Sequence, residues 1–319
     1  MTGDNSFLMN LSSVIGGIKF DACIWNAAGA WCTTFEELKD LADSEAGAVL
    51  SKSCTLEARE GNPHPKYYQN KWGTINSNGL ENLGYKKYIE FASQLKKISK
   101  KPYLISFSGI KSEENFVMLK DLSVAKDVDM LEFNPGSPNT IGKPIVGYDF
   151  EAMDGLLARA KSMGKKPWGV KLPPYFDIVH FDQIAKILNN HQPDYVCSIN
   201  SLGNSLIIDP EKEQVVIKPK GGLGGVGGAY TKPTGLANIY ALRKRLNEDI
   251  KLVGVGGVMS GMDAFEYILA GADAVQTASA LMMEGPSCFA RIKKELSEVM
   301  ERKGYRKISD FKGKLKEIE

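Results

Sequence analysis

Two lysines and two asparagines stand at the ends of short apolar runs, where side chains can meet a ligand. They are Lys52, Lys171, Asn134 and Asn200. An ammonium group binds anions or forms a Schiff base, and an amide both donates and accepts hydrogen bonds. Each residue alone is usually a solvated lysine or a turn asparagine. Their joint occurrence predicts a site that works with lysines and amides, without an acid or a histidine.

One of these asparagines opens a loop that is crowded with residues that stop regular structure, Asn134-Pro135-Gly136-Ser137-Pro138-Asn139. Its prolines and glycine set a tight, non-helical path. Its asparagines and serine are short, neutral hydrogen-bonding groups. Taken alone the segment is an ordinary surface turn, whereas after a barrel strand it is typical of an active-site loop.

Small residues near the C-terminus are typical of a phosphate site. Gly256-Gly257 and Ala278-Ser279 each come between an apolar run and a helical pattern. Backbone N–H groups at such a position can face an anion, and barrels bind phosphate after their last two strands. The run 224–228, Gly-Gly-Val-Gly-Gly, would bring flexible backbone near the same ligand. Plain tight turns are the alternative.

The elements that must position these residues alternate between short apolar strands and amphipathic helices. Strands are predicted at 23–25, 46–50, 102–108, 128–133, 168–172, 195–199, 252–255 and 274–276. Helices are predicted at about 33–42, 85–99, 112–126, 149–163, 177–190, 234–246, 260–270 and 286–300. Eight such units predict an α/β fold, a (β/α)8 TIM barrel, in which strand C-termini converge on one face.

Three further features complete the predicted architecture. A hairpin at 8–14 and 18–20 would cap the bottom of the barrel, and insertions at 54–83 and 203–230 would lie at its C-terminal face. Residues 1–319 are expected to form a single domain. A doubly wound open sheet is the alternative, but no GxGxxG follows the first strand.

Composition excludes several classes of function. The net charge of +2 argues against nucleic acid. The five cysteines show no CxxC spacing, which favours free thiols in a reducing cytoplasm. The three histidines show no metal-ligand pattern, so no metal is expected. No window is apolar enough to span a membrane, and no secretory signal is apparent.

A phosphate-bearing cofactor flanked by a lysine and several amides suggests a flavin. Its pyrimidine edge needs donors and acceptors, and its reduced form needs a cation near N1. Lys171 could be that cation. Lys52 could take the same role or bind a substrate carboxylate.

At this point the chain resembles a family, the dihydroorotate dehydrogenases, and more narrowly their soluble, fumarate-linked class 1A. The resemblance runs nearly end to end. The motifs on which it rests are 26–29 (NAAG), 51–55 (SKSCT), 59–63 (REGNP), 76–80 (NSNGL), 142–144 (GKP), 170–177 (VKLPPYFD), 199–201 (INS) and 256–257 (GG).

The resemblance implies an FMN barrel that oxidises dihydroorotate to orotate in pyrimidine synthesis, with fumarate as acceptor, as a homodimer. By position, the residues implied at FMN are Ala28, Lys52, Ser53, Asn134, Lys171, Ile199, Gly228, Gly256, Gly257, Ala278 and Ser279. Those implied at the substrate are Lys52, Asn76, Asn78, Gly79, Leu80, Asn134, Asn139, Asn200 and Ser201. The implied base, which removes a proton from C5, is Ser137, with Lys52 beside it.

The chain departs from the family pattern at three places. Ser137 stands where class 1 enzymes carry a cysteine, in a loop that there reads Asn-Leu-Ser-Cys-Pro-Asn. Asn78 replaces a typical methionine, and Ala278-Ser279 replaces Gly-Thr.

Three alternatives stay open: a paralogous flavoenzyme acting on another cyclic amide or dihydropyrimidine, a Schiff-base lyase barrel without flavin, and a flavin-binding protein with little catalysis.

Overall fold

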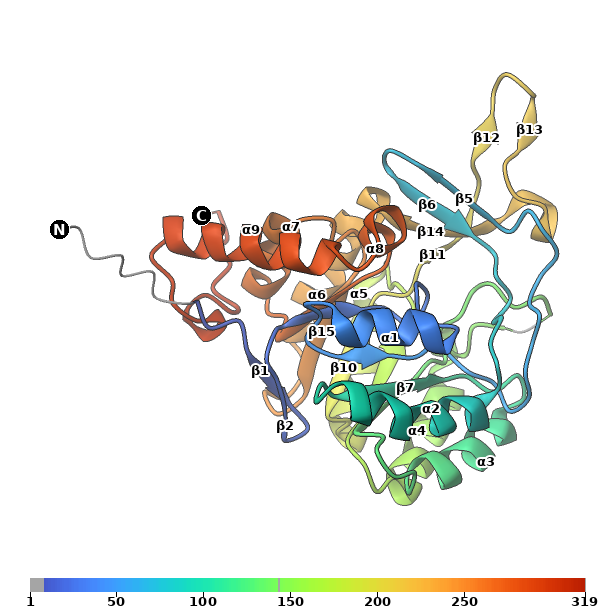
Figure 1. Cartoon of the computed structure of the whole chain (residues 1–319), viewed down its shortest axis with the longest axis horizontal. Coiled ribbons are helices and arrows are strands. Elements are labelled where there is room, and N and C mark those ends of the chain that lie inside the picture. The colour runs from blue at the N-terminus through green and yellow to red at the C-terminus, as the bar shows by residue number, and fades with distance from the viewer. Residues whose placement is uncertain (1–8, 143, 319) are drawn as a thin grey trace.

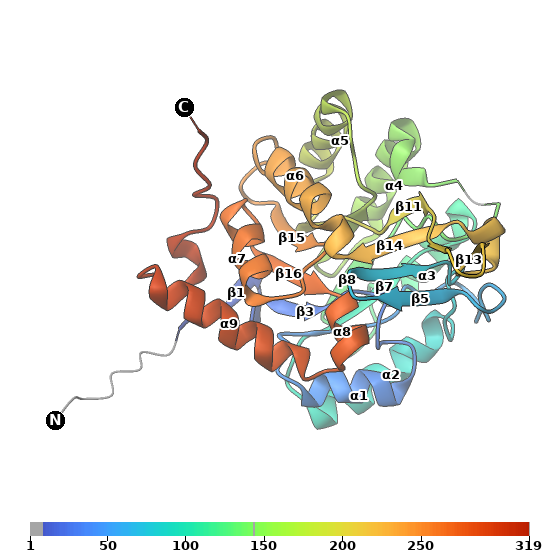
Figure 2. The ribbon, with the colours of Figure 1, turned by 90° about the horizontal axis from the view of Figure 1, so that it is seen from above.

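The computed structural model describes residues 9–142 and 144–318. Its main sheet has eight strands in the order β3-β16-β15-β10-β9-β8-β7-β4, and every neighbouring pair is parallel. The strands are β3 Ile24–Asn26, β4 Val49–Leu50, β7 Tyr103–Phe107, β8 Met130–Phe133, β9 Trp168–Leu172, β10 Tyr195–Ser198, β15 Lys251–Val255 and β16 Ala274–Thr277. The sheet curls into a barrel surrounded by helices (Figure 1; Figure 2), which confirms the predicted (β/α)8 fold.

Helices follow the strands and cover the outside of the barrel. They are α1 Phe35–Asp43, α2 Tyr85–Ile98, α3 Ser112–Leu122, α4 Phe150–Met163, α5 Ile178–His191, α6 Lys232–Arg243, α7 Gly261–Leu269, α8 Ser279–Glu284 and α9 Cys288–Arg302. Local sequence explains several of their starts. Thr34 and Glu37 form a capping box at α1, as do Ser260 and Asp263 at α7.

A side chain closes the barrel between its first and second strands. The sheet order ends at β3 and β4, and no ladder joins these two strands. Asn26 bridges them instead: its Nδ2 donates to the Leu50 carbonyl at 2.7 Å, and its Oδ1 accepts from the Leu50 amide at 3.0 Å. Below it, the Gly47 amide donates to the Ile24 carbonyl at 2.8 Å. One amide side chain therefore sets the register between β3 and β4.

A small cluster of buried polar side chains lies on the strands β8, β9, β10 and β16. Glu132 on β8 is fully buried, and its Oε2 accepts from the Tyr195 hydroxyl at 3.3 Å and from Gln276 Nε2 at 2.9 Å. The Gln276 oxygen in turn faces Lys171 and the Cys197 thiol. These contacts satisfy the Tyr195 hydroxyl, the Gln276 amide and Oε2 of Glu132, whereas Oε1 of Glu132 is buried without a hydrogen-bond partner among the described residues.

The predicted hairpin forms, but its first strand is short. β1 is Ser13–Ile15 and β2 is Ile18–Phe20, paired antiparallel. The left-handed pair Gly16-Gly17 makes the turn between them. Of the predicted first strand, 8–14, residue 8 lies outside the described residues.

The two predicted insertions pair with each other across the C-terminal face, which the sequence did not indicate. β5 Tyr67–Asn70, β6 Gly73–Asn76, β14 Gly224–Gly228 and β11 Leu202–Ser205 form an antiparallel sheet in the order β11-β14-β6-β5. A further hairpin, β12 Ile208–Asp209 with β13 Gln214–Val215, extends away from the barrel as an arm (Figure 1). The short helix α8 was also not predicted.

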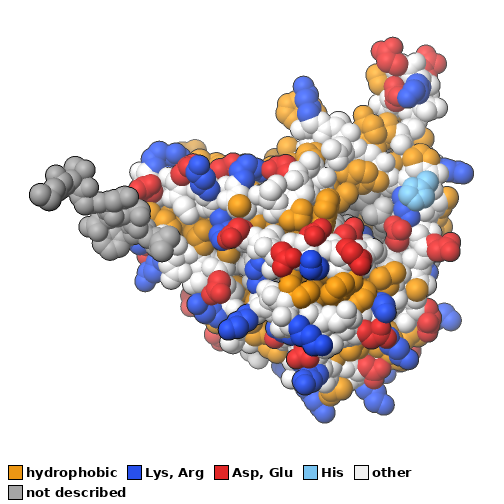
Figure 3. Space-filling view, in the orientation of Figure 1, with side chains coloured by type: hydrophobic (Ala, Val, Ile, Leu, Met, Phe, Trp, Pro, Cys, Tyr) orange, Lys and Arg blue, Asp and Glu red, His pale blue; other side chains and the backbone are white. Residues whose placement is uncertain are grey.

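The surface carries charges of both signs. Figure 3 shows lysine, arginine and acidic side chains interspersed over one face of the molecule. This mixing agrees with the net charge of +2 and offers no broad basic area on that face. Within the described residues, no helix combines the length and the hydropathy that crossing a bilayer requires.

Candidate active site

One pocket at the C-terminal ends of the barrel strands brings together every site residue that the sequence predicted. Its lining includes Ala28, Lys52, Ser53, Asn76, Asn78, Gly79, Leu80, Asn134, Ser137, Asn139, Lys171, Ile199, Asn200, Ser201, Gly228, Gly256, Gly257, Ala278 and Ser279. The barrel strands and the β5–β6–β14 sheet supply its walls. Residues far apart in sequence therefore share one cavity because parallel strands end on the same face.

Two buried lysines give this pocket its charge. The side chain of Lys52 donates to the Gly29 carbonyl at 3.0 Å, and that of Lys171 reaches Gln276 Oε1 at 3.5 Å. Both residues are nearly enclosed, at 8% and 6% exposure. In the described part of the chain, no carboxylate forms an ion pair with either lysine. A buried ammonium group without an ion-pair partner is costly unless a ligand compensates its charge, so the two lysines suit an anionic ligand.

Asn134 is the centre of a hydrogen-bonded group on the pocket floor. Its Oδ1 accepts from Asn200 Nδ2 at 3.0 Å and from the Gly136 amide at 3.2 Å. Its Nδ2 donates to Ser53 Oγ at 3.0 Å, and that hydroxyl is bonded to Ser106 at 2.8 Å. The group joins the ends of four strands, so the amides are held rigidly before any ligand arrives.

Asn139 presents an acceptor that the protein leaves unused. Its Nδ2 donates to Asn76 Oδ1 at 3.0 Å, and Asn76 Nδ2 points to the Gly225 carbonyl at 3.4 Å. This chain fixes the orientation of both amides. The remaining Oδ1 of Asn139 is buried and has no partner among the described residues. A buried acceptor without a donor is expensive, which indicates a ligand N–H at this point.

Ser137 lies at the edge of the same pocket on a closely packed loop. A side chain at Gly136 would place its Cβ 2.9 Å from the Pro173 nitrogen, so only glycine fits before Ser137. On the other side, Lys220 Nζ donates to the Pro138 carbonyl at 3.1 Å. The loop is thereby held from both sides, and the serine side chain is almost buried at 9% exposure.

No cysteine offers a reactive thiolate in place of this serine. All five cysteines are buried and unpaired. Burial raises the pKa of the Cys32 thiol to about 12, although Lys52 and Lys171 act in the opposite direction. Burial also raises the pKa of Cys197 well above its ordinary value. The candidate base in this loop is therefore the hydroxyl of Ser137 and not a cysteine thiol.

The segments after β15 and β16 form a backbone cradle. Gly257 has φ +69°, and a Cβ there would lie 2.7 Å from Lys232 Cβ and 2.8 Å from the Gly228 carbonyl. Within the described residues, the amide N–H groups of Gly257, Val258 and Ala278 donate to no protein acceptor. All three residues line the pocket. Free amide donors held by close packing suit a phosphate group.

The structure adds lining residues that the sequence did not indicate. Tyr67 and Thr74 come from the unforeseen sheet, and Met259 and Met282 flank the cradle. Gln276 also lines the pocket from inside β16. Gln276 could have been found from the sequence, because an amide in the middle of a buried apolar strand must meet a polar partner.

Comparison with known proteins identifies the family of this chain. A family model described as dihydroorotate dehydrogenase matches residues 10–300. The chain belongs to the dihydroorotate dehydrogenase family. Members of this oxidoreductase family are generally dependent on a flavin.

The curated relatives of the family are similar over nearly their whole length. Dihydroorotate dehydrogenase A (fumarate) from Lactococcus lactis subsp. cremoris is 48% identical over 97% of this chain and 100% of its own. A similar protein from Lactococcus lactis subsp. lactis is also 48% identical, with the same coverage. The resemblance to the fumarate-linked class is thereby confirmed.

A solved structure supports the same fold. The ferulenol complex of the dihydroorotate dehydrogenase from Eimeria tenella aligns with a TM-score of 0.81 at 20% identity. The alignment covers 96% of this chain and 88% of that one.

Proposed function

We propose that this chain is an FMN-dependent dihydroorotate dehydrogenase that forms orotate for pyrimidine synthesis and passes its electrons to fumarate. The observation that carries the proposal is the pair of buried lysines, Lys52 and Lys171, which form no ion pair with a carboxylate among the described residues and face a pocket lined with amides. A phosphate-bearing flavin and an anionic, planar diamide would together supply the missing negative charge and hydrogen-bond partners.

FMN would be held on one side of the pocket, where it would supply the hydride acceptor for C6 of the substrate. The free amides of the cradle suit its phosphate, and the Lys171 ammonium suits the charge that develops on the reduced ring. The residues proposed to hold it are Ala28, Lys52, Ser53, Asn134, Lys171, Ile199, Gly228, Gly256, Gly257, Ala278 and Ser279.

Dihydroorotate fits the asparagine side of the same pocket. Lys52 would bind its carboxylate, and the free oxygen of Asn139 would accept from one of its ring N–H groups. The residues proposed to hold it are Lys52, Asn76, Asn78, Gly79, Leu80, Asn134, Asn139, Asn200 and Ser201. Fumarate is also a planar carboxylate and would bind the same lysine after orotate leaves.

Ser137 is proposed to take the proton from C5 of the substrate. An alcohol is far less acidic than a thiol and becomes a base at greater cost. The rigid loop around Gly136 and Pro138 would keep the hydroxyl in place for the transfer. Slow proton removal is the expected consequence of serine at this position.

The wider setting is proposed from the same features. Residues 1–319 would act as a single barrel domain, and the five unpaired cysteines suit the cytoplasm. An exposed apolar groove supports a homodimer: Phe176, at 73% exposure, lines it together with Tyr148 and Leu202. The neighbouring arm, with Ile208 exposed, would extend this contact.

The purified protein tests the proposal directly. We expect a yellow protein with flavin absorption that bleaches on anaerobic mixing with dihydroorotate and recovers on addition of fumarate. A colourless protein that cannot take up FMN would exclude every flavin reading. If the flavin binds but stays oxidised over minutes with dihydroorotate, the substrate assignment is wrong, and a flavoenzyme with another substrate becomes the better proposal. Sedimentation analysis tests the dimer, with Phe176→Ser expected to weaken it.

A further inference from the structure

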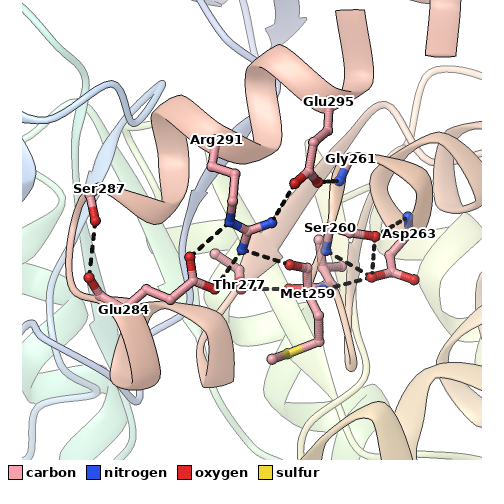
Figure 4. A network of polar contacts seen from close by, with 10 residues as sticks. Met259, Ser260, Gly261, Asp263, Thr277, Glu284, Ser287, Arg291 and Glu295 are labelled. Carbon is pink, nitrogen blue, oxygen red and sulfur yellow. Dashed lines mark hydrogen bonds and ion pairs between the residues drawn. The ribbon is translucent and has the colours of Figure 1, made fainter. Parts of the chain in front are cut away.

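Arg291 on α9 connects the two backbone segments of the cradle from behind. Its Nε and Nη2 donate to the two oxygens of Glu284 at 2.8 and 2.5 Å, and Nη2 also donates to the Met259 carbonyl at 2.9 Å (Figure 4). Glu284 ends α8, which begins at the second segment, and Met259 lies in the first. One guanidinium group therefore bridges the two segments that line the pocket at its phosphate side.

The same network continues to the start of α7. Arg291 Nη1 donates to Glu295 Oε1 at 2.8 Å, and Glu295 Oε2 accepts from the Gly261 amide at 2.7 Å (Figure 4). Asp263 accepts from the amides of Met259 and Ser260 at 2.9 and 2.8 Å. The backbone amides of residues 259–261 are thus bound by acidic side chains of the protein.

Two more side chains hold the carbonyls nearer the pocket. The Tyr267 hydroxyl donates to the Gly256 carbonyl at 2.6 Å, and Thr277 Oγ1 donates to the Val258 carbonyl at 2.7 Å. Carbonyls along the segment therefore bond to the protein, while the amides of Gly257 and Val258 stay free within the described residues. The network therefore occupies these carbonyl acceptors and leaves the two amide donors for a ligand.

Arg291 acts through this backbone and not by direct contact. It does not line the pocket in the described structure, and two carboxylates already balance its charge. The hydrogen bonds that Arg291 donates to Glu284 raise the pKa of its guanidinium further above its ordinary value, so the group stays charged at any working pH. A planar fork with several fixed donors suits this task, whereas a lysine would reach fewer partners.

We propose that Arg291 is a positioning residue for the FMN phosphate, holding the cradle segments 256–261 and 278–284 at the spacing that a phosphate requires. The inference rests on the proposed function, since it assumes that FMN binds this pocket. Arg291, on the outer helix α9, should therefore contribute to the affinity for FMN but not to the affinity for a flavin that lacks the phosphate.

The test compares two flavins that differ only in that group. The full chain, freed of flavin, is titrated with FMN and with riboflavin while flavin fluorescence is followed. We expect Arg291→Gln to raise the Kd for FMN about tenfold or more, equivalent to about 1.4 kcal/mol, while the Kd for riboflavin changes less than about twofold. Arg302→Gln, which removes an exposed arginine from the same helix, should change neither constant.

The outcomes separate the inference from the proposed function. An unchanged FMN affinity, or an equal loss for both flavins, overturns the role of Arg291. Arg291→Lys, expected to give an intermediate loss for FMN alone, keeps the test decisive if the glutamine variant does not fold. Wild-type protein that binds neither flavin would instead refute the proposed cofactor.

Discussion

The ammonium nitrogen of Lys171 lies 3.5 Å from the side-chain oxygen of Gln276 inside the barrel. The nitrogen of the same amide donates to Glu132 at 2.9 Å, which fixes the orientation of the amide and turns its oxygen toward the lysine. A buried carboxylate thus determines what the lysine meets, without an ion pair that would neutralise it. The arrangement leaves the positive charge available to a ligand in the pocket.

Removing that charge should impair flavin reduction. We expect Lys171→Gln to lower the midpoint potential of bound FMN and to slow its reduction by dihydroorotate by about 10²–10³, the usual cost of losing one stabilising donor. Potentiometric titration and anaerobic stopped-flow measure the two effects. Lys165→Gln, which changes an exposed lysine three residues before β9, is the matched control. Equal potentials in the variant and wild type would contradict the assignment.

Removing the free acceptor of Asn139 should weaken substrate binding. Because a buried hydrogen bond contributes about 1–3 kcal/mol when its loss leaves a group unpaired, Asn139→Ala should raise the Kd for orotate about 5- to 150-fold. Titration of the flavin spectrum with orotate gives the constant. Asn190→Ala on the exposed side of α5 should leave it unchanged. If both variants bind orotate like wild type, Asn139 is not a ligand.

Replacing the serine base with a thiol should accelerate the reductive step. A thiol ionises near pH 8.5 and an alcohol does not, so Ser137→Cys should reduce flavin faster near neutral pH and gain rate as pH rises toward 9. Ser137→Ala should lose most of the wild-type rate. Anaerobic stopped-flow across pH 6–9 tests both. No gain in the folded cysteine variant, or full activity in the alanine variant, would remove Ser137 from the mechanism.

The buried thiols predict how stability changes with pH. Burial raises the pKa of Cys23, Cys32 and Cys288 from 9.0 to about 12. The unfolded chain therefore loses these protons first, so the stabilisation is complete below about pH 9 and declines as pH rises toward 12. Urea unfolding at pH 8 and at pH 10.5 should show the loss, and Cys32→Ala should reduce it.

Alkylation provides an independent check of the same thiols. With iodoacetamide at pH 8, the native protein should take up no label, and the urea-unfolded protein should take up five. Rapid labelling of the native protein would show that the thiols are exposed or ionised.

Much of the fold could be predicted because the barrel strands have recognisable local sequence patterns. Runs such as 168–172 and 195–199 are short, apolar and flanked by helical patterns, so their type and order follow from periodicity. The sheet formed by β5, β6, β11 and β14 could not be predicted in the same way. Its central pair, β6 and β14, joins segments about 150 residues apart in sequence. The strands are rich in glycine and polar residues, and only their pairing in space makes them strands.

The candidate site divides in a similar manner. Lys52, Asn134 and Asn200 could be found from the rule that parallel strands end on one face. Tyr67 and Thr74 could not, because they reach the pocket on the distant sheet. The free oxygen of Asn139 also needed coordinates, since only the bond to Asn76 shows which half of the amide is left for a ligand.

The closure of the barrel by Asn26 makes one position unusually intolerant of substitution. The planar amide offers a donor and an acceptor at the spacing of a peptide group, so it acts as a missing residue of backbone between β3 and β4. Aspartate lacks the donor, glutamine is one methylene too long, and serine cannot do both at that reach. Because Ala28 and Lys52 follow the two joined strands, a substitution at Asn26 would shift these two neighbouring parts of the pocket lining relative to each other.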